Sequence, residues 1–373
     1  MSQEIALRPD RRFLPRDLSE ELALWTPYLA TAAGYITSVA LIAKANGLGV
    51  FLRLTSYHTV MQLSTVATAF LAVIGYLAFL AFGERERRPL RRMGRDFATH
   101  ILPPHSLAGL LIPLLSIPFI VGAFSSFKAM IPILNPFHLD PLFEKIDRLL
   151  HFGIAPWQIT HFLFRGEALN LLLQIAYNSW FALMWVFMFG HVCWLKDRSA
   201  RARYLLAFIL CWIVIGSLFA FLLSSAGPCF YGRVYEGVDP YGPLMAQLHA
   251  IHQPMVESGQ HWSIWSLWVQ DALWYNYTHN LQMLGSGISA MPSMHVSMAV
   301  LMALGAFRFS RLIGRIMTVY AVLILIGSVH LGWHYAIDGY LSAILTGLIW
   351  HVSGRAIARM ERGRADRPHA QAL

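Results

Sequence analysis

Long apolar runs dominate the pattern of residues along the chain, and short polar clusters separate them. A helix that crosses the hydrocarbon core of a bilayer needs about 20 mostly apolar residues. The pattern predicts eight such helices, at 25–43, 60–82, 106–127, 171–194, 204–224, 291–307, 313–330 and 336–352. We therefore predict an all-α fold, a polytopic membrane helical bundle.

Composition agrees with this class. The 373 residues are 56% hydrophobic and 13% charged, whereas a soluble domain usually carries about 25% charged residues. The chain is therefore predicted to be an integral membrane protein.

The distribution of the basic residues predicts the topology. Most of them lie in alternate polar segments: the N-terminal tail, 83–96, 196–203, 308–315 and the C-terminal tail. Lys and Arg collect on the cytoplasmic side of membrane proteins, so both termini are expected there. The net charge of +9 is then explained by the basic cytoplasmic segments and their contact with the membrane. No nucleic-acid partner is expected.

Two histidine-containing stretches fall on the opposite, outer side of this topology. ISAMPSMHVSM at 288–298 places His295 at the start of the sixth apolar segment, and GSVHLGWHYAIDGY at 327–340 carries His334 and Asp338. A four-residue spacing puts His334 and Asp338 on one face of a helix. The carboxylate then orients the imidazole as a nucleophile, and His295 is a candidate to protonate a leaving oxygen.

The residues before His295 suit an anion. Proline is favoured at the first position of a helix, and free backbone N–H groups at a helix start bind phosphate. Pro292-Ser293-Met294 therefore predicts a phosphate site. Together these residues predict phosphoryl transfer through a phosphohistidine, with no cofactor and no metal.

Each feature also has a structural interpretation. Asp338 could cap the last helix, and a histidine at a helix end is commonly structural. Asp140 and Asp147 are expected to be solvated or to cap helices. Four histidines of the second outer loop could suggest zinc, although structural zinc sites have tighter ligand spacing: His249, His252, His261 and His279.

Three spaced motifs resemble the signatures of the type 2 phosphatidic acid phosphatase superfamily, in the same order. They are Lys128-x6-Asn135-Pro136, Pro292-Ser293-Met294-His295 and Ser328-x5-His334-x3-Asp338. The fragments KAMIPILNPFHLDPLFEKIDRLLHFG, SSAGPCFY and WHYAID resemble the branch that includes inositol phosphorylceramide synthases.

The resemblance implies roles for the matching residues. His334 would be the nucleophile, Asp338 its orienting partner and His295 the general acid. Lys128, Ser293 and the backbone amides near Met294 would bind phosphate. It also implies a six-helix phosphatase-like core at 106–352, with a tail at 1–24, two additional helices and a basic loop at 25–105, and a basic tail at 353–373.

The chain departs from the family pattern at two arginines, where it has Asn135 and Ser328. Arginine would normally fork onto phosphate oxygens. Asn135 itself, Arg233 and His330 are candidates to bind the phosphate in place of these arginines. Arg233 could instead be a loop cation with no role in binding. Lys128 could be a lysine whose charged end reaches toward the membrane interface. The losses favour a diester substrate or a transferase over a monoester phosphatase.

We therefore expect a lipid phosphotransferase or lipid phosphatase that acts at the outer face of the membrane. Its substrate would be a phospholipid, a sphingolipid or a polyprenyl phosphate. The arginine and alanine content favours a bacterial inner membrane with a periplasmic active site. The alternative is a non-catalytic lipid-binding or lipid-transporting protein on the same fold.

Overall fold

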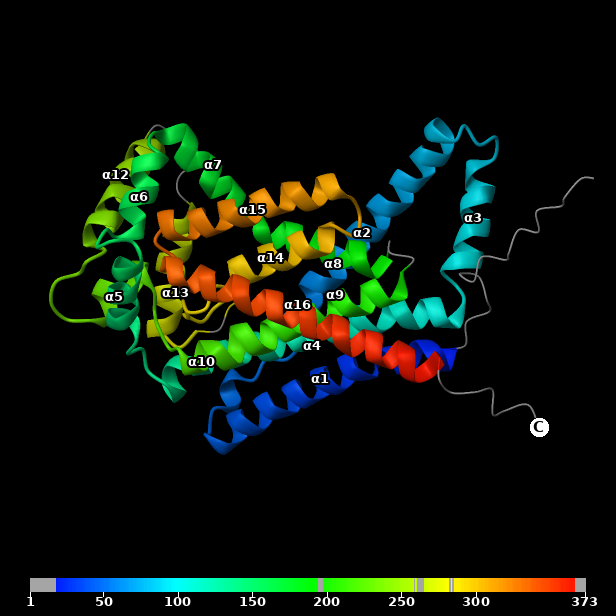
Figure 1. The fold of residues 1–373 in the computed structure, drawn as a ribbon, viewed down its shortest axis with the longest axis horizontal. Coiled ribbons are helices and arrows are strands. Elements are labelled where there is room, and N and C mark those ends of the chain that lie inside the picture. The colour runs from blue at the N-terminus through cyan, green and yellow to red at the C-terminus, as the bar shows by residue number, and fades with distance from the viewer. Residues whose placement is uncertain are drawn as a thin grey trace, which may run out of the picture.

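The computed structural model describes residues 18–193, 197–257, 259, 265–281, 283 and 285–365. All regular secondary structure in these residues is helical (Figure 1). The helices are α1 (Leu18–Ala45), α2 (His58–Ala78), α3 (Pro89–His100), α4 (Pro104–Leu134), α5 (Asp140–Leu150), α6 (Pro156–Leu163), α7 (Glu167–Asn178), α8 (Trp180–Cys193), α9 (Arg198–Leu210), α10 (Ala220–Leu222), α11 (Tyr231–Val234), α12 (Gly242–Glu257), α13 (Trp265–Thr278), α14 (Met294–Ala306), α15 (Arg311–His330) and α16 (Ala336–Ala365). A π-helical stretch, Cys211–Phe219, joins α9 to α10.

Seven helical stretches of the described chain are long and apolar enough to cross a membrane. They are Leu18–Ala45, His58–Gly83, Pro104–Leu134, Ala168–Cys193, Arg198–Leu222, Arg311–His330 and Ala336–Arg362. The prediction of an all-helical membrane bundle is thereby confirmed. Each of these spans covers one of the predicted apolar segments.

The remaining predicted segment, the sixth at 291–307, is a shorter helix than expected. α14 has 13 residues, which corresponds to about 20 Å of helix, less than the roughly 30 Å of a bilayer core. It packs against α8, α9, α15 and α16, so protein rather than lipid surrounds it. A short helix is stable there because its neighbours satisfy the polar groups of its ends.

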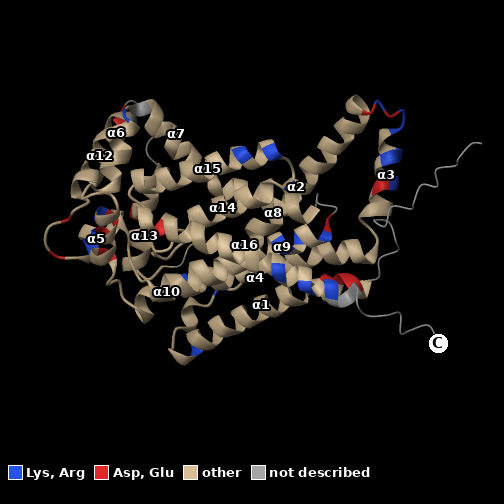
Figure 2. Cartoon of the chain, in the orientation of Figure 1, with Lys and Arg blue, Asp and Glu red and all other residues tan. Residues whose placement is uncertain are grey.

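The two ends of the bundle differ in charge (Figure 2). The basic helix α3 and the start of α9 lie at one end, which we call the basic end. Helices α5, α6, α12 and α13 lie at the other, which we call the loop end (Figure 1). The predicted tails 1–24 and 353–373 fall partly outside the described residues.

Helices α5 and α6 form one segment of the loop end. Asp140, Phe143 and Asp147 are buried on one face of α5. By contrast, Leu149 is 78% exposed and Phe152, just after the helix, is 97% exposed. The buried face is directed at the catalytic candidates described below.

Candidate functional site

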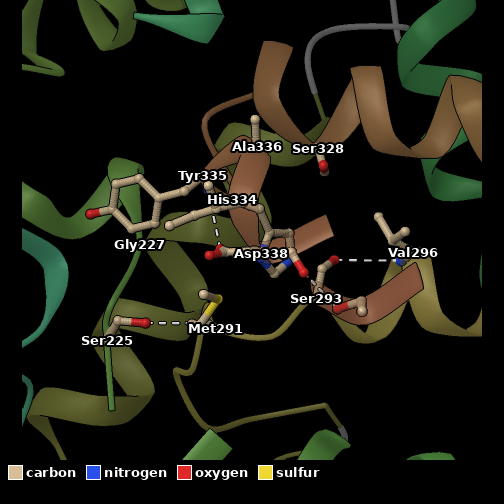
Figure 3. A network of polar contacts seen from close by, with 12 residues as sticks. Ser225, Gly227, Met291, Ser293, Val296, Ser328, His334, Tyr335, Ala336 and Asp338 are labelled. Atoms are coloured by element: carbon tan, nitrogen blue, oxygen red, sulfur yellow. Dashed lines mark hydrogen bonds and ion pairs between the residues drawn. The ribbon is translucent and has the colours of Figure 1, made fainter. Parts of the chain in front are cut away.

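His334 and Asp338 form a hydrogen-bonded pair at the start of α16 (Figure 3). The distance from Nδ1 of His334 to Oδ2 of Asp338 is 3.2 Å. The same carboxylate oxygen accepts the backbone N–H of Tyr335 at 3.1 Å. Since the carboxylate can only accept, Nδ1 carries the proton and Nε2 keeps its lone pair.

The turn between α15 and α16 fixes the backbone of His334. The N–H groups of Trp333 and His334 both donate to the carbonyl of Ser328, at 3.0 and 3.1 Å. Gly332 has a φ of +74°, a conformation that glycine adopts without strain. The imidazole is therefore held both through its own backbone and through Asp338.

His334 is buried, with 6% of its surface exposed. Burial lowers the pKa of His334 to about 3, and the nearby charge of Lys128 acts in the same direction. The imidazole is therefore neutral at physiological pH, which is the form that can attack phosphorus.

His295 faces this pair from the first turn of α14. The ring centroids of His295 and His334 are 5.6 Å apart. The ring of Tyr177 stacks on His295 at 4.6 Å, and the ring of Trp180 lies 4.5 Å away. The site thus brings together two imidazoles from different helices, one neutral and carboxylate-bound, the other held between aromatic rings.

Ser293 begins α14 as its N-cap. Its Oγ accepts the N–H of Val296 at 3.4 Å, and its own N–H donates to the carbonyl of Asp338 at 3.3 Å (Figure 3). The second contact joins the start of α14 directly to α16. The free N–H groups of the first turn, beginning at Met294, therefore lie beside the histidine pair.

Lys128 lies within α4 and is half-buried. Its positive charge is close enough to act on both His295 and His334. No carboxylate in the described part of the chain forms an ion pair with it. Gly287 packs against its stem, because a Cβ there would come within 3.1 Å of Lys128 Cγ.

Three other predicted phosphate ligands have partners away from the pair. Asn135 donates through Nδ2 to the carbonyl of Phe221 at 2.6 Å. Arg233 forms an ion pair with Asp271 at 2.6 Å. The Nε2 of His330 lies 2.6 Å from Oδ1 of Asn170.

The sequence Ser225-Ala226-Gly227 links the two histidine loops. Ser225 accepts the N–H of Ala290 on its carbonyl at 3.0 Å and the N–H of Met291 on its Oγ at 3.1 Å (Figure 3). Further along the same loop, the N–H of Cys229 donates to the carbonyl of Gly332 at 2.9 Å. The fragment SSAGPCFY therefore holds both the loop before His295 and the turn before His334.

Asp140 anchors this linking loop. Its side chain is fully buried and accepts four hydrogen bonds, from the N–H of Ala226 (2.8 Å) and Gly227 (2.7 Å) and from the hydroxyls of Tyr235 (2.9 Å) and Tyr335 (2.8 Å). The expectation that Asp140 is solvated is wrong, because these donors replace water.

Asp147 is also buried and caps α16. Its carboxylate accepts the N–H of Ala336 at 2.9 Å and of Ile337 at 3.1 Å. The expectation of a capping role is confirmed for Asp147, and that of solvation is wrong. Both carboxylates lie on the apolar face of α5, two helical turns apart, which is the sequence signal that could have identified them.

Among the described residues, no three His, Cys, Asp or Glu side chains lie close enough together to hold a metal ion. One of the four histidines considered for zinc, His261, lies outside those residues.

Residues 142–352 match the family model of the PAP2 superfamily. This is more than half of the chain. The chain belongs to the PAP2 superfamily. No curated protein and no solved structure matches it.

Membership in the PAP2 superfamily indicates phosphatase-type chemistry on lipid substrates. The matched region contains the linking loop, both histidine loops and most of α5. At the position of the arginine in the third family signature, this PAP2 protein has Ser328, which is fully buried and donates to the carbonyl of Leu325 at 2.7 Å. The hydroxyl of Ser328 therefore bonds within α15 and supplies no charge for a phosphate.

Proposed function

We propose that this PAP2 protein transfers a phosphoryl-containing headgroup from a membrane lipid through a phosphohistidine on His334. The observation that carries the proposal is the buried His334–Asp338 pair, with the ring of His295 5.6 Å from that of His334. Transfer through a covalent intermediate requires a nucleophile, a carboxylate that orients it and an acid–base group. His334, Asp338 and His295 suit these three roles in that order.

In the first step, Nε2 of His334 attacks the phosphorus atom, and the bond from phosphorus to the leaving oxygen breaks. Burial lowers the pKa of His295 in the free site, and the negative charge of the bound phosphate favours its protonated form. His295 then gives its proton to that oxygen. In the second step, a hydroxyl group attacks the phosphohistidine, His295 takes the hydroxyl proton, and the nitrogen–phosphorus bond breaks. Water as acceptor gives hydrolysis, and a lipid or polyol hydroxyl gives transfer.

The charge available for the phosphate favours a diester. Lys128 and the N–H groups at the start of α14 are the groups near the pair that suit an anion, and neither family arginine is present. A phosphodiester carries one negative charge, whereas an ionised monoester carries up to two. We therefore infer that the donor is a phospholipid or related diester, as in the inositol phosphorylceramide synthase branch.

The location of the pair favours action at the outer leaflet. His334 lies between the loop-end termini of α15 and α16, whereas the basic α3 lies at the opposite end (Figures 1 and 2). By the positive-inside rule, the basic end is cytoplasmic. In a bacterial inner membrane, the site would then open to the periplasm.

A substrate screen with purified protein tests this function. Radiolabelled phosphatidic acid, phosphatidylglycerol phosphate, undecaprenyl diphosphate and phosphatidylinositol are offered with and without ceramide or diacylglycerol. His334→Ala is run in parallel, and His138→Ala, an exposed histidine at the same end, serves as the control. We expect a new phosphate-containing lipid that appears only with an acceptor and is absent in His334→Ala.

Release of free phosphate without an acceptor would identify a phosphatase instead. Equal turnover by His334→Ala and wild type would refute the mechanism. Binding of these lipids without any turnover would support the non-catalytic alternative.

A further inference from the structure

A pocket of about 560 Å³ lies at the loop end, between α6, the turn that precedes α7, and α12. Its polar lining comes from Trp157, Gln158, His161, Arg165, Asn170 and Gln247. Neither histidine of the catalytic pair nor Asp338 lines it. The pocket is therefore separate from the place where His334 would attack phosphorus.

The walls of this pocket offer hydrogen-bond donors. Gln158, Arg165 and Gln247 line the pocket with exposed side chains that carry N–H groups. These N–H groups can donate hydrogen bonds to the oxygen atoms of a ligand. Arg165 lies over the ring of Phe162 at 4.5 Å, and none of the described side chains that line the pocket is an Asp or Glu.

The pocket lies at the ends of two candidate membrane spans. Asn170, which lines the pocket, belongs to the span Ala168–Cys193. His161, which also lines it, contacts His330 at the end of the span Arg311–His330. The rings of His161 and His330 stack at 3.9 Å. Beside the pocket, Phe162 and Leu163 are 64% and 62% exposed, and apolar side chains at this level contact the membrane interface.

Two elements connect the pocket to the histidine pair. Asn170 and His161 hold His330, which lies one helical turn before His334. Helix α7, which begins at the pocket, also carries Tyr177, the residue that stacks on His295. An occupant of the pocket therefore contacts elements that position both histidines.

We propose that this pocket binds the headgroup of a second lipid, separate from the molecule that His334 attacks. The donor-rich walls and Arg165 suit an anionic headgroup with phosphate and hydroxyl oxygens, such as a phosphorylated polyol. The exposed Phe162 and Leu163 suit the acyl region of the same lipid. Binding here does not depend on catalysis by His334.

Lipid binding by the His334→Ala protein tests the proposal without turnover. Native mass spectrometry compares phosphatidylinositol, phosphatidylglycerol and phosphatidylcholine as probes. Gln247→Leu removes an amide from the pocket wall but keeps a side chain of similar size, and Arg165→Ala removes an exposed cation. Lys145→Ala, an exposed cation of α5 outside the pocket, is the matched control.

We expect the two anionic lipids to bind at least tenfold more tightly than phosphatidylcholine. Gln247→Leu and Arg165→Ala should each weaken this binding about fivefold to tenfold, and Lys145→Ala should leave it within twofold. Equal binding by all four proteins, or equal binding of the three lipids, would overturn the proposal. Competition by free inositol 1-phosphate at the same concentration as the lipid would assign the pocket to a soluble ligand and overturn the lipid assignment.

Discussion

Asp140 of α5 accepts a hydrogen bond from the hydroxyl of Tyr335 at 2.8 Å, and Tyr335 is the neighbour of His334 in the chain. The same carboxylate holds the N–H groups of Ala226 and Gly227. A helix outside the candidate spans therefore joins the turn of one catalytic candidate to the loop that supports the other.

This relationship predicts different effects for two tyrosines. Tyr335→Phe and Tyr235→Phe each remove one hydroxyl from Asp140, so each should cost about 0.5–1.5 kcal/mol of stability. Only Tyr335→Phe should also lower kcat, by several-fold, because Tyr335 is adjacent to His334. Thermal unfolding and steady-state kinetics measure the two effects, and equal kcat values in both variants would contradict the positioning role.

Gly227→Ala should be far more damaging than Gly237→Ala. Both glycines have a φ near +100°, so both substitutions introduce backbone strain of about 1–2 kcal/mol. Only at Gly227 would the new Cβ lie 2.9 Å from the carbonyl oxygen of Trp333 and 3.0 Å from Cβ of Ala290; at Gly237 no atom lies within 4 Å. The difference in thermal unfolding midpoint isolates this contact, and similar midpoints would show that the linking loop moves freely.

Asp338→Asn should retain the fold and lose activity. The amide is nearly the same size as the carboxylate, but it can present its NH₂ group to Nδ1 of His334 and so favour the wrong tautomer. Removing such an orienting charge lowers kcat by up to about 10⁴-fold in a serine protease, and we expect a loss of about 10²–10⁴-fold here. Activity within threefold of wild type would mean that Asp338 only caps α16.

The buried imidazole of His334 predicts a stability change with pH. Because its pKa is lowered to about 3 while the unfolded value is about 6.5, the unfolded state binds more protons between these values. Stability should therefore fall as pH falls below about 6.5, by about 1.4 kcal/mol per pH unit for this group.

The comparison of unfolding midpoints between pH 7 and pH 4.5 measures this contribution. His334→Gln should show a shallower decline than wild type, and His138→Gln, at an exposed site, should follow wild type. A steeper decline in His334→Gln would contradict a neutral, buried His334.

Local patterns predicted most of the fold. Apolar runs of about 20 residues identify spans because unsatisfied backbone groups are too costly in lipid for any other structure. The same rule misjudged 291–307, because α14 lies inside the bundle, where its length does not have to match the membrane. The positions of His295, His334 and Asp338 at helix starts also followed from short spacings in the sequence.

The sequence by itself determined the class of the protein, its spans and the four-residue spacing that pairs His334 with Asp338, because hydrophobic length and helical period are local properties. Only the tertiary structure decided that Asp140 and Asp147 are buried supports of this pair, and that Asn135, Arg233 and His330 have other partners. These contacts join residues 38 to 195 positions apart, so they depend on how the helices pack and no local pattern could assign them.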